Sequence, residues 1–135
     1  MKRQNIQPDA LSKRVVGGHV LYTHVVTVEE GRRLIFIAGQ VARDRHGNNV
    51  GKGDMGAQIR QVGENVKAAL AAVDATLKDV VKTTTFVTDI GEYLKQVDVR
   101  MEYFGPGLPT STTVEVRKLA HPDFLVEVEA MAVTG

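Results

Sequence analysis

The stretch "DVVKTTTFVTD", residues 79–89, is the most informative part of the chain, because it predicts a strand that leads directly into a helix. Its β-branched residues favour an extended backbone, in which alternate side chains point to opposite faces. One face then carries Lys82, Thr84 and Phe86, and the other carries Val81, Thr83, Thr85 and Val87. Asp89 is the expected N-cap of the next helix, with Glu92 three residues later to complete a capping box.

Amphipathic helices are predicted on both sides of this strand. Upstream, Asp54 is the expected N-cap of a long helix with apolar residues at helical spacing. Those residues are Met55, Ile59, Val62, Val66, Ala69, Leu70 and Val73. The downstream helix is expected to bury Tyr93, Leu94, Val97, Met101 and Phe104. Gly105 and Pro106 predict its end.

Four more strands are expected around this centre, at residues 20–28, 34–39, 112–117 and 124–133. "EEGRR" predicts a hairpin turn between the first two, and "QVARDRHGNNVGKGD" predicts a mobile loop. That loop matches neither a Walker loop nor GxGxxG, so no phosphate site is expected there. The order β-β-α-β-α-β-β predicts one α+β domain over residues 1–135. We expect a two-layer sandwich, a mixed sheet with two helices on one face.

The last strand predicts what covers the other face of the sheet. Alternate side chains should point to the helices: Phe124, Val126, Val128, Ala130 and Ala132. The opposite side carries Leu125, Glu127, Glu129, Met131 and Val133. This mixture is too apolar for free solvent and too charged for a sealed core. It predicts a subunit interface with a wet site in it, and therefore a homo-oligomer.

Composition excludes several classes of function. The 135 residues carry 17 basic and 16 acidic side chains, a net charge of +1, and the short basic clusters form no stripe. We therefore expect no nucleic-acid partner. No cysteine is present, and the histidines lack metal-ligand spacing, so neither a metal nor another cofactor is expected. No apolar stretch predicts a signal peptide or a membrane span, which favours a cytoplasmic protein without a membrane partner.

Residues 106–116, "PGLPTSTTVEV", predict a rim of hydroxyl groups. A bend at Pro106–Pro109 leads into Ser111, Thr112 and Thr113 at the start of a strand. The first side chains of a strand that begins at a sharp bend stand at the edge of the sheet, where binding sites are often built. No charged residue precedes Glu115 along this rim.

Several segments together resemble the Rid family, also known as the YjgF or "L-PSP endoribonuclease" family. They are "VLYTHVV" (20–26), "LIFIAGQV" (34–41), the run 58–90, "MEYFG" (101–105), "PTSTTVEV" (109–116) and "FLVEVEAMAV" (124–133). They cover most of the chain in the family's order and spacing. The resemblance implies a chorismate-mutase-like fold. It also implies a homotrimer whose sheets surround a central barrel, with three sites in the clefts between subunits.

The resemblance also implies a reaction and a set of site residues. The best-known members hydrolyse imines and enamines such as 2-aminoacrylate to 2-oxo acids and ammonia. By resemblance, the substrate pocket includes Tyr22, Thr23, Ala38 and Gly39. Glu127 is the implied catalytic group, which activates the water that attacks the C=N carbon and then protonates the departing nitrogen.

The family's deaminases hold the substrate carboxylate with an arginine, and this chain has Ser111 at that position and Thr112 after it. Arginine offers two charge-assisted hydrogen bonds, whereas serine offers one neutral bond of about 1 kcal/mol. The resemblance is therefore to the branches that lack the arginine. It predicts a deaminase of small C–N metabolites with an altered substrate preference, for which Ser111 and Thr112 are expected to line the pocket.

Other interpretations stay open at this stage. One alternative is a homotrimer that keeps the pocket and binds a small molecule without catalysis. A ribonuclease is the least favoured alternative. Glu127 is equally interpretable as an interfacial glutamate held by an arginine across the trimer. Four basic residues are candidates to replace the missing arginine: Arg43, Arg100, Arg117 and Lys118. His24 and Asp98 are interpreted as structural or solvated groups, and no GxSxG elbow supports a triad on Ser111.

Overall fold

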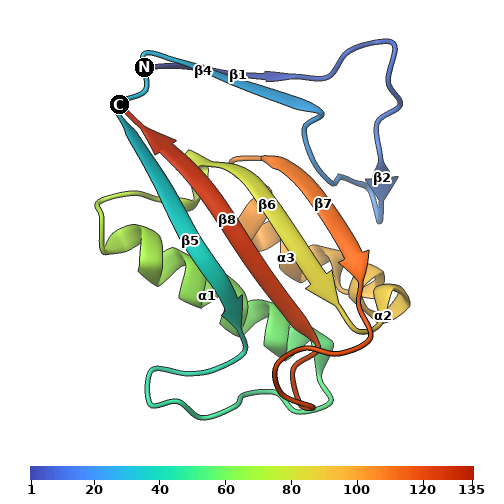
Figure 1. Cartoon of the computed structure of the whole chain (residues 1–135). Coiled ribbons are helices and arrows are strands. Elements are labelled where there is room, and N and C mark those ends of the chain that lie inside the picture. Colours follow the sequence, from blue (N-terminus) through green and yellow to red (C-terminus); the bar gives the residue numbers. More distant parts are fainter.

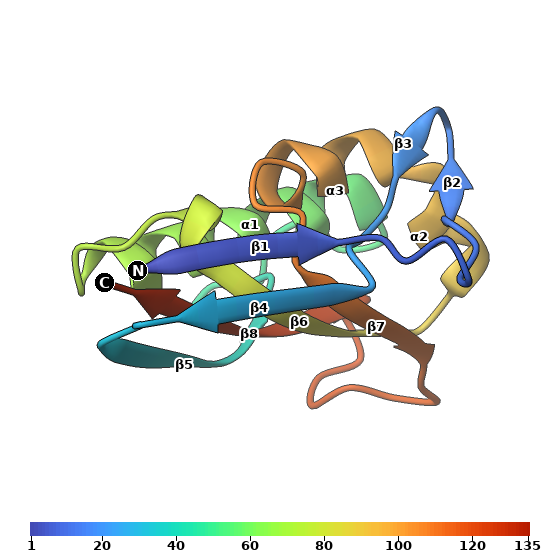
Figure 2. The same ribbon diagram turned by 90° about the horizontal axis from the view of Figure 1, so that it is seen from above.

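The main sheet has four strands in the order β5-β8-β6-β7, and the helices cover one of its faces (Figures 1 and 2). The computed structural model describes all 135 residues. The main elements are β5 (Arg33–Val41), α1 (Met55–Ala71), the 3-10 turn η1 (Leu77–Asp79), β6 (Val80–Val87), α2 (Ile90–Lys95), α3 (Val97–Phe104), β7 (Thr110–Glu115) and β8 (Val126–Thr134). β6 and β7 are parallel and the other pairs antiparallel, so the predicted two-layer α+β sandwich with a mixed sheet is confirmed.

Both predicted helix starts are confirmed by their caps. The Asp54 side chain accepts a hydrogen bond from the Ala57 N–H at 3.0 Å, and Asp89 accepts one from the Glu92 N–H at 3.0 Å. The predicted second helix is interrupted at Gln96, whose φ of −103° and ψ of 27° separate α2 from α3. Gly105 caps the end of α3, as expected.

The core lies between the sheet and α1. The five residues of the last strand segment that were expected to face the helices are all buried. Val133 is buried on the opposite side, because the turn at Gly31 lies over it. In β6 the predicted alternation holds from Lys82 to Val87, with Thr83, Thr85 and Val87 buried, but Val81 is not buried with them. The pairing of β6 with β8 shifts between Val80 and Lys82, and Val80 occupies the core instead.

The prediction of one strand over residues 20–28 is also wrong. The segment is divided into β3 (His19–Val20) and β4 (Val25–Glu29), and no strand covers residues 21–24. The Gln7 side chain takes the place of a neighbouring strand there. Its Nε2 donates to the Tyr22 carbonyl at 2.8 Å, and its Oε1 accepts from the His24 N–H at 3.0 Å.

The expected hairpin between residues 20–28 and 34–39 does not form. β4 pairs instead with an N-terminal strand that no pattern in the sequence predicts, β1 (Lys2–Ile6). β2 (Val15–Val16) pairs with β3. The β1–β4 ribbon crosses above one end of the sheet, as Figure 2 shows. Asn5 Nδ2 fixes it there by donating to the carbonyls of Gly107 and Leu108, at 3.1 and 3.0 Å.

The segment between β5 and α1 is a loop, as predicted, and its first part is a tight turn around Asp44. The Asp44 carboxylate accepts hydrogen bonds from the N–H groups of His46 and Asn48, both at 2.9 Å. These bonds, led by that of Asn48, hold the pKa of Asp44 below its usual value. None of the helices in the structure combines the length and apolarity that a bilayer-spanning helix needs.

Candidate functional site

A hollow of about 360 Å³ lies beside β7, which is an edge strand of the sheet. We call it the Ser111 pocket; its lining residues are Arg14, Leu21, Tyr22, Ile90, Leu94, Arg100, Ser111, Thr112 and Thr113. They come from the segment before β4, from α2 and α3, and from β7. The bend before β7 brings its first residues beside Tyr22, since the Thr23 N–H donates to the Pro109 carbonyl at 3.1 Å.

Ser111 and Thr112 point to opposite faces of β7. Ser111 is in register with Thr83, which is buried under the helices, so its side chain faces the helix layer. Thr112 is exposed and in register with Thr84, on the uncovered side of the sheet. Only the Ser111 hydroxyl therefore points toward α3. Thr112 contributes to the pocket wall at the strand edge.

Arg100 lies behind the Ser111 hydroxyl. Its guanidinium comes from α3, is 5% exposed, and donates from Nη2 to the Ser111 Oγ at 3.2 Å and to the Leu21 carbonyl at 3.1 Å. Its Cζ is 5.7 Å from the centroid of the Tyr93 ring. Burial raises the pKa of the Tyr93 phenol, and the Arg100 cation partly opposes that rise.

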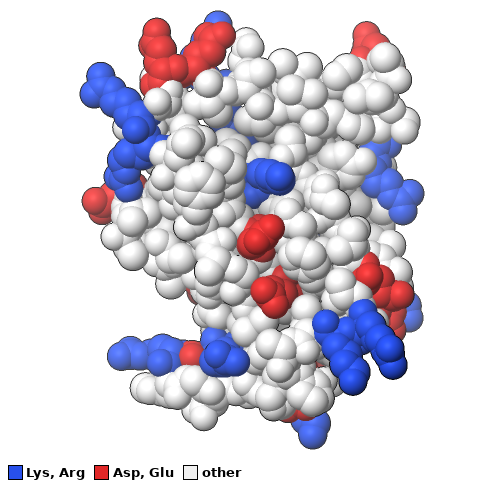
Figure 3. Space-filling view, in the orientation of Figure 1, with Lys and Arg blue, Asp and Glu red and all other residues white.

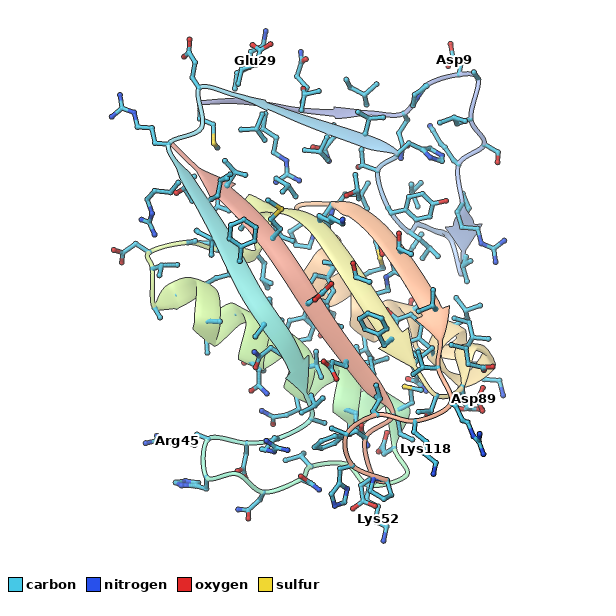
Figure 4. The ribbon with its side chains drawn as sticks, viewed as in Figure 1. Asp9, Glu29, Arg45, Lys52, Asp89 and Lys118 are labelled. Atoms are coloured by element: carbon cyan, nitrogen blue, oxygen red, sulfur yellow. The ribbon has the colours of Figure 1, made fainter.

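Of the four basic residues considered as replacements for the missing arginine, only Arg100 lines the Ser111 pocket. Arg43 lies over the Phe124 ring, with its Cζ 5.3 Å from the centroid. Arg117 and Lys118 follow β7 and are exposed. Figure 4 shows Lys118 beyond the end of β7, whereas Ser111 is near the start of that strand.

Tyr22 also borders a second hollow, of about 230 Å³, together with Thr23, His24, Lys82 and the first residues of β7. The Tyr22 and His24 rings pack edge to face with centroids 5.3 Å apart. Thr23 is only 1% exposed, and its hydroxyl accepts from Asn5 Nδ2 at 3.0 Å. His24 Nε2 is 2.8 Å from the Ser12 carbonyl, which agrees with a structural role. Tyr22 is therefore the most available of these three side chains.

Glu127 lies against Gly39. The pairing of β5 with β8 shifts between Ile37 and Gln40, and this irregularity contains Ala38 and Gly39. A Cβ atom added to Gly39 would be 2.0 Å from Glu127 Oε2, so the carboxylate lies where only glycine leaves room. The carboxylate is half-buried and forms no ion pair within the chain. Ala38 borders a separate hollow of about 400 Å³ with Lys82 and Glu129.

The uncovered face of the sheet, which we call the open face, has the mixed character that the last strand predicts. Phe36 and Leu34 are 73% and 63% exposed there, and Val114 is also exposed. Figure 3 looks onto this face and shows a few acidic and basic groups surrounded by uncharged surface. Such a face is typical of a surface that another protein chain covers.

One chain does not bring Glu127 and Ser111 together. Across the sheet, Ser111 is in register with Thr83 on β6, and Thr83 is in register with Ala130 on β8. Ala130 is three positions from Glu127 along β8. With ordinary strand spacings, the two Cα atoms are roughly 14 Å apart. Their side chains also point to different faces. The predicted site residues therefore form two groups, one around Ser111 and Tyr22 and the other around Glu127 and Gly39.

The remaining polar candidates form no further site. Asp98 Oδ1 is 2.8 Å from His19 Nε2 in an exposed contact that joins α3 to β3. No group of three histidine, aspartate or glutamate side chains converges in a way that would hold a metal ion. The expectation that the protein uses no metal stays a prediction.

Sequence and structure comparisons agree on the relatives of this chain. The family described as Endoribonuclease L-PSP matches residues 17–134. A RutC family protein of Pyrococcus horikoshii is 43% identical over 99 residues, which are 73% of this chain and 78% of that protein. Protein DfrA of Myxococcus xanthus is 34% identical over 134 residues, 99% of this chain and 98% of its own length.

Solved structures of the same family share the fold. YyfB of Yersinia pestis, a protein of the conserved Rid family, superposes with a TM-score of 0.84 at 31% identity, over 98% of this chain and 99% of that one. Rv2704 of Mycobacterium tuberculosis, a member of the YjgF/YER057c/UK114 family, has a TM-score of 0.65 at 30% identity, over 98% and 100% of the two chains. The chain therefore belongs to the Rid family, also named after YjgF and endoribonuclease L-PSP.

Proposed function

We propose that the protein is a hydrolytic deaminase of small imines, enamines or related C–N metabolites, with Glu127 as its catalytic group. The observation that carries the proposal is the Glu127 carboxylate itself. It is half-buried, lies against Gly39 beside a strand irregularity, and has no cation within ion-pair distance in its own chain. A carboxylate left free in this way is available to move protons. Family membership supplies the reaction class.

The reaction consumes one water, and both protons of that water end on the nitrogen. Glu127 takes the first proton as the water oxygen attacks the C=N carbon and delivers it to the nitrogen, which gives a tetrahedral amino alcohol. Glu127 then takes the hydroxyl proton and delivers it to the amino nitrogen as the C–N bond breaks, and the products are a carbonyl compound and ammonia. The same carboxylate acts as base and then as acid, so no cofactor is required.

We also propose that the working site lies between subunits of a homotrimer. The separation of Glu127 from Ser111 within one chain supports this arrangement, because a second copy is needed to bring the two groups together. The exposed Phe36 and Leu34 of the open face support it as well. In this assembly the substrate lies between the Ser111 pocket of one protomer and the Glu127 of another, and Tyr22, Ala38 and Thr112 complete the walls. Thr23 supports the wall from behind, because it is only 1% exposed and its N–H and hydroxyl are bonded to Pro109 and Asn5.

Imine hydrolysis is the direct test of this proposal. An amino-acid or amine oxidase generates imines in situ, and semicarbazide traps the portion that the protein fails to hydrolyse. We expect the protein to lower semicarbazone formation from at least one class in a panel of α-imino acids and carboxylate-free imines. Unchanged trapping across the whole panel at micromolar protein would contradict the proposed activity.

A second prediction concerns the room that Gly39 leaves for Glu127. Gly39→Ala puts a methyl group into the position of the carboxylate, whose flexible end has to move. A displacement of about 1 Å at a catalytic group lowers turnover by about 100-fold, and we expect a loss of that order. Gly91→Ala is the matched control, since its added Cβ meets only an ordinary contact at 3.4 Å. Equal turnover of the two variants would show that the position of Glu127 does not matter.

The second candidate function is a small-molecule-binding trimer without catalysis. It is favoured by one observation, the serine at the position of the family's arginine. Thermal-shift screening would then find ligands that the protein does not convert, and steady product release from any of them would exclude this alternative. The chain's net charge of +1 and its separate basic clusters give no support to a ribonuclease.

A further inference from the structure

We infer that Arg100 takes over the role of carboxylate anchor, with the Ser111 hydroxyl as the group that touches the ligand, so that the Ser111 pocket selects small carboxylates. The inference names the substrate class of the proposed function and rests on that function only for the reaction. Anion binding by the pocket stands without it. Four features of the pocket support this role: its charge, its hydrogen bonds, its size and the position of its cation.

The first feature is the missing counter-charge. Arg100 is 5% exposed, yet the ion pairs of the chain involve other residues only. A buried cation is costly unless an opposite charge accompanies it. The Ser111 pocket that Arg100 borders contains a second arginine, Arg14, and none of its lining residues is acidic. The pocket therefore carries positive charge that a bound anion would balance.

The second feature is the direction of the hydrogen bonds. Arg100 Nη2 donates to the Leu21 carbonyl and to the Ser111 Oγ, so the guanidinium holds the hydroxyl from behind. The Ser111 Oγ accepts this bond and keeps its own proton to donate. A neighbouring cation strengthens such a donor. No carboxylate accepts a hydrogen bond from the Arg100 guanidinium, so the positive charge behind Ser111 is not neutralised within the chain.

The third feature is size. A hollow of about 360 Å³ is at the small end of the range typical of small-molecule sites. Its walls add apolar contacts from Leu21, Ile90 and Leu94 and an aromatic ring from Tyr22. This combination fits a carboxylate that bears a short aliphatic chain. The corresponding substrates are α-imino acids of small aliphatic amino acids, and the corresponding products are 2-oxo acids.

The fourth feature is the position of the positive charge. The family's arginine is expected on β7, whereas Arg100 approaches the same place from α3 and places a serine hydroxyl between itself and the ligand. One hydrogen bond from the serine hydroxyl, strengthened by the neighbouring cation, then replaces the bidentate pair that an arginine forms with a carboxylate. We expect weaker binding of carboxylates than a direct arginine fork gives, with the preference for a negative charge retained.

The test compares two ligands of nearly equal shape, 2-oxobutanoate and its uncharged amide, 2-oxobutanamide, by calorimetric titration. We expect the wild-type protein to bind the carboxylate at least about 10-fold more tightly than the amide, because hydrogen bonds to charged groups are stronger. Arg100→Gln should remove that preference and leave the weak binding of the amide unchanged. Arg60→Gln is the matched control, since Arg60 is an exposed helix arginine paired with Glu102, and it should retain the preference.

Each further result decides between the inference and its rejection. Ser111→Ala covers the case in which Arg100→Gln fails to fold, and it too should abolish the preference. Equal wild-type affinity for the two ligands, or a preference that survives in Arg100→Gln, would overturn the inference. A third result would also overturn it: Arg100→Gln binds 2-oxobutanoate as tightly as the wild type, while sedimentation analysis shows that its oligomer has dissociated. Arg100 would then pair with a neighbouring subunit rather than with a ligand. Carboxylate selectivity without imine hydrolysis would reject the proposed reaction and retain the anchor.

Discussion

Glu127→Gln is expected to lower kcat/KM for imine hydrolysis by about 100- to 10,000-fold, the usual contribution of a general acid–base group. Glutamine has the same shape as glutamate but cannot take a proton from water at neutral pH. The side chain has no ion-pair partner in the chain, so the change breaks no salt bridge. We expect the free energy of unfolding to change by about 1 kcal/mol or less.

Glu129→Gln is the matched control for this variant. Glu129 lies two residues further along β8 on the same open face, where it borders the hollow with Lys82 and Ala38. Steady-state rates of the two variants, measured on the substrate that the imine panel identifies, separate a catalytic role from a general effect of negative charge. Full turnover by Glu127→Gln would contradict the assigned mechanism. Equal losses in both variants would show that turnover depends on the negative charge of the open face rather than on Glu127 itself.

Gln58→Leu is expected to destabilise the folded chain strongly. Gln58 is 1% exposed in α1, and its side chain satisfies three backbone groups. Nε2 donates to the carbonyls of Gly51 and Asp123 at 3.0 and 2.7 Å, and Oε1 accepts from the Leu125 N–H at 2.8 Å. Leucine fills the space but leaves the Asp123 carbonyl and the Leu125 N–H without a partner, whereas the Gly51 carbonyl keeps its bond from the Asp54 N–H at 2.9 Å. An unsatisfied buried group costs about 1–3 kcal/mol, so we expect a loss of about 2 kcal/mol or more.

Chemical denaturation at a fixed protein concentration measures this loss, because the stability of an oligomer depends on concentration. Gln61→Leu is the matched control in the same helix, since the Gln61 side chain bonds only to Asn65, at 2.9 Å. We expect Gln61→Leu to lose about 1 kcal/mol. If the Gln58→Leu protein is as stable as the Gln61→Leu protein, water has replaced the hydrogen bonds that Gln58 makes to backbone groups of the two loops.

Local signals predicted the parts of the fold that depend on neighbouring residues. The caps at Asp54 and Asp89 and the helical spacing of apolar residues fixed the starts of α1 and α2. The irregularity that puts Val80 rather than Val81 in the core arises from pairing with β8, which no local pattern records. The same holds for residues 21–24, because their backbone is bonded to the side chain of Gln7 rather than to a strand.

Only part of the candidate site was predictable from the sequence. The family resemblance placed Gly39 and Glu127 in one pocket, and the structure brings their atoms into contact. Arg100 was one of four basic candidates, and only the packing of α3 against β7 distinguishes it. Asn5, which occupies the Thr23 hydroxyl, belongs to no motif and lies far from Thr23 along the chain. Contacts of this kind are set by tertiary packing, which a single sequence does not encode in any short pattern.

The alternation of side chains along β7 separates ligand choice from subunit contacts. Position 111 faces the arginine and the pocket, whereas positions 112 and 114 face the surface that we propose to contact other subunits. A substitution at Ser111 is therefore expected to alter ligand choice and one at Val114 to alter the contacts of the assembly, whereas Thr112, which also lines the pocket, affects both. Ligand choice and assembly are thus separable at positions 111 and 114 of a single strand.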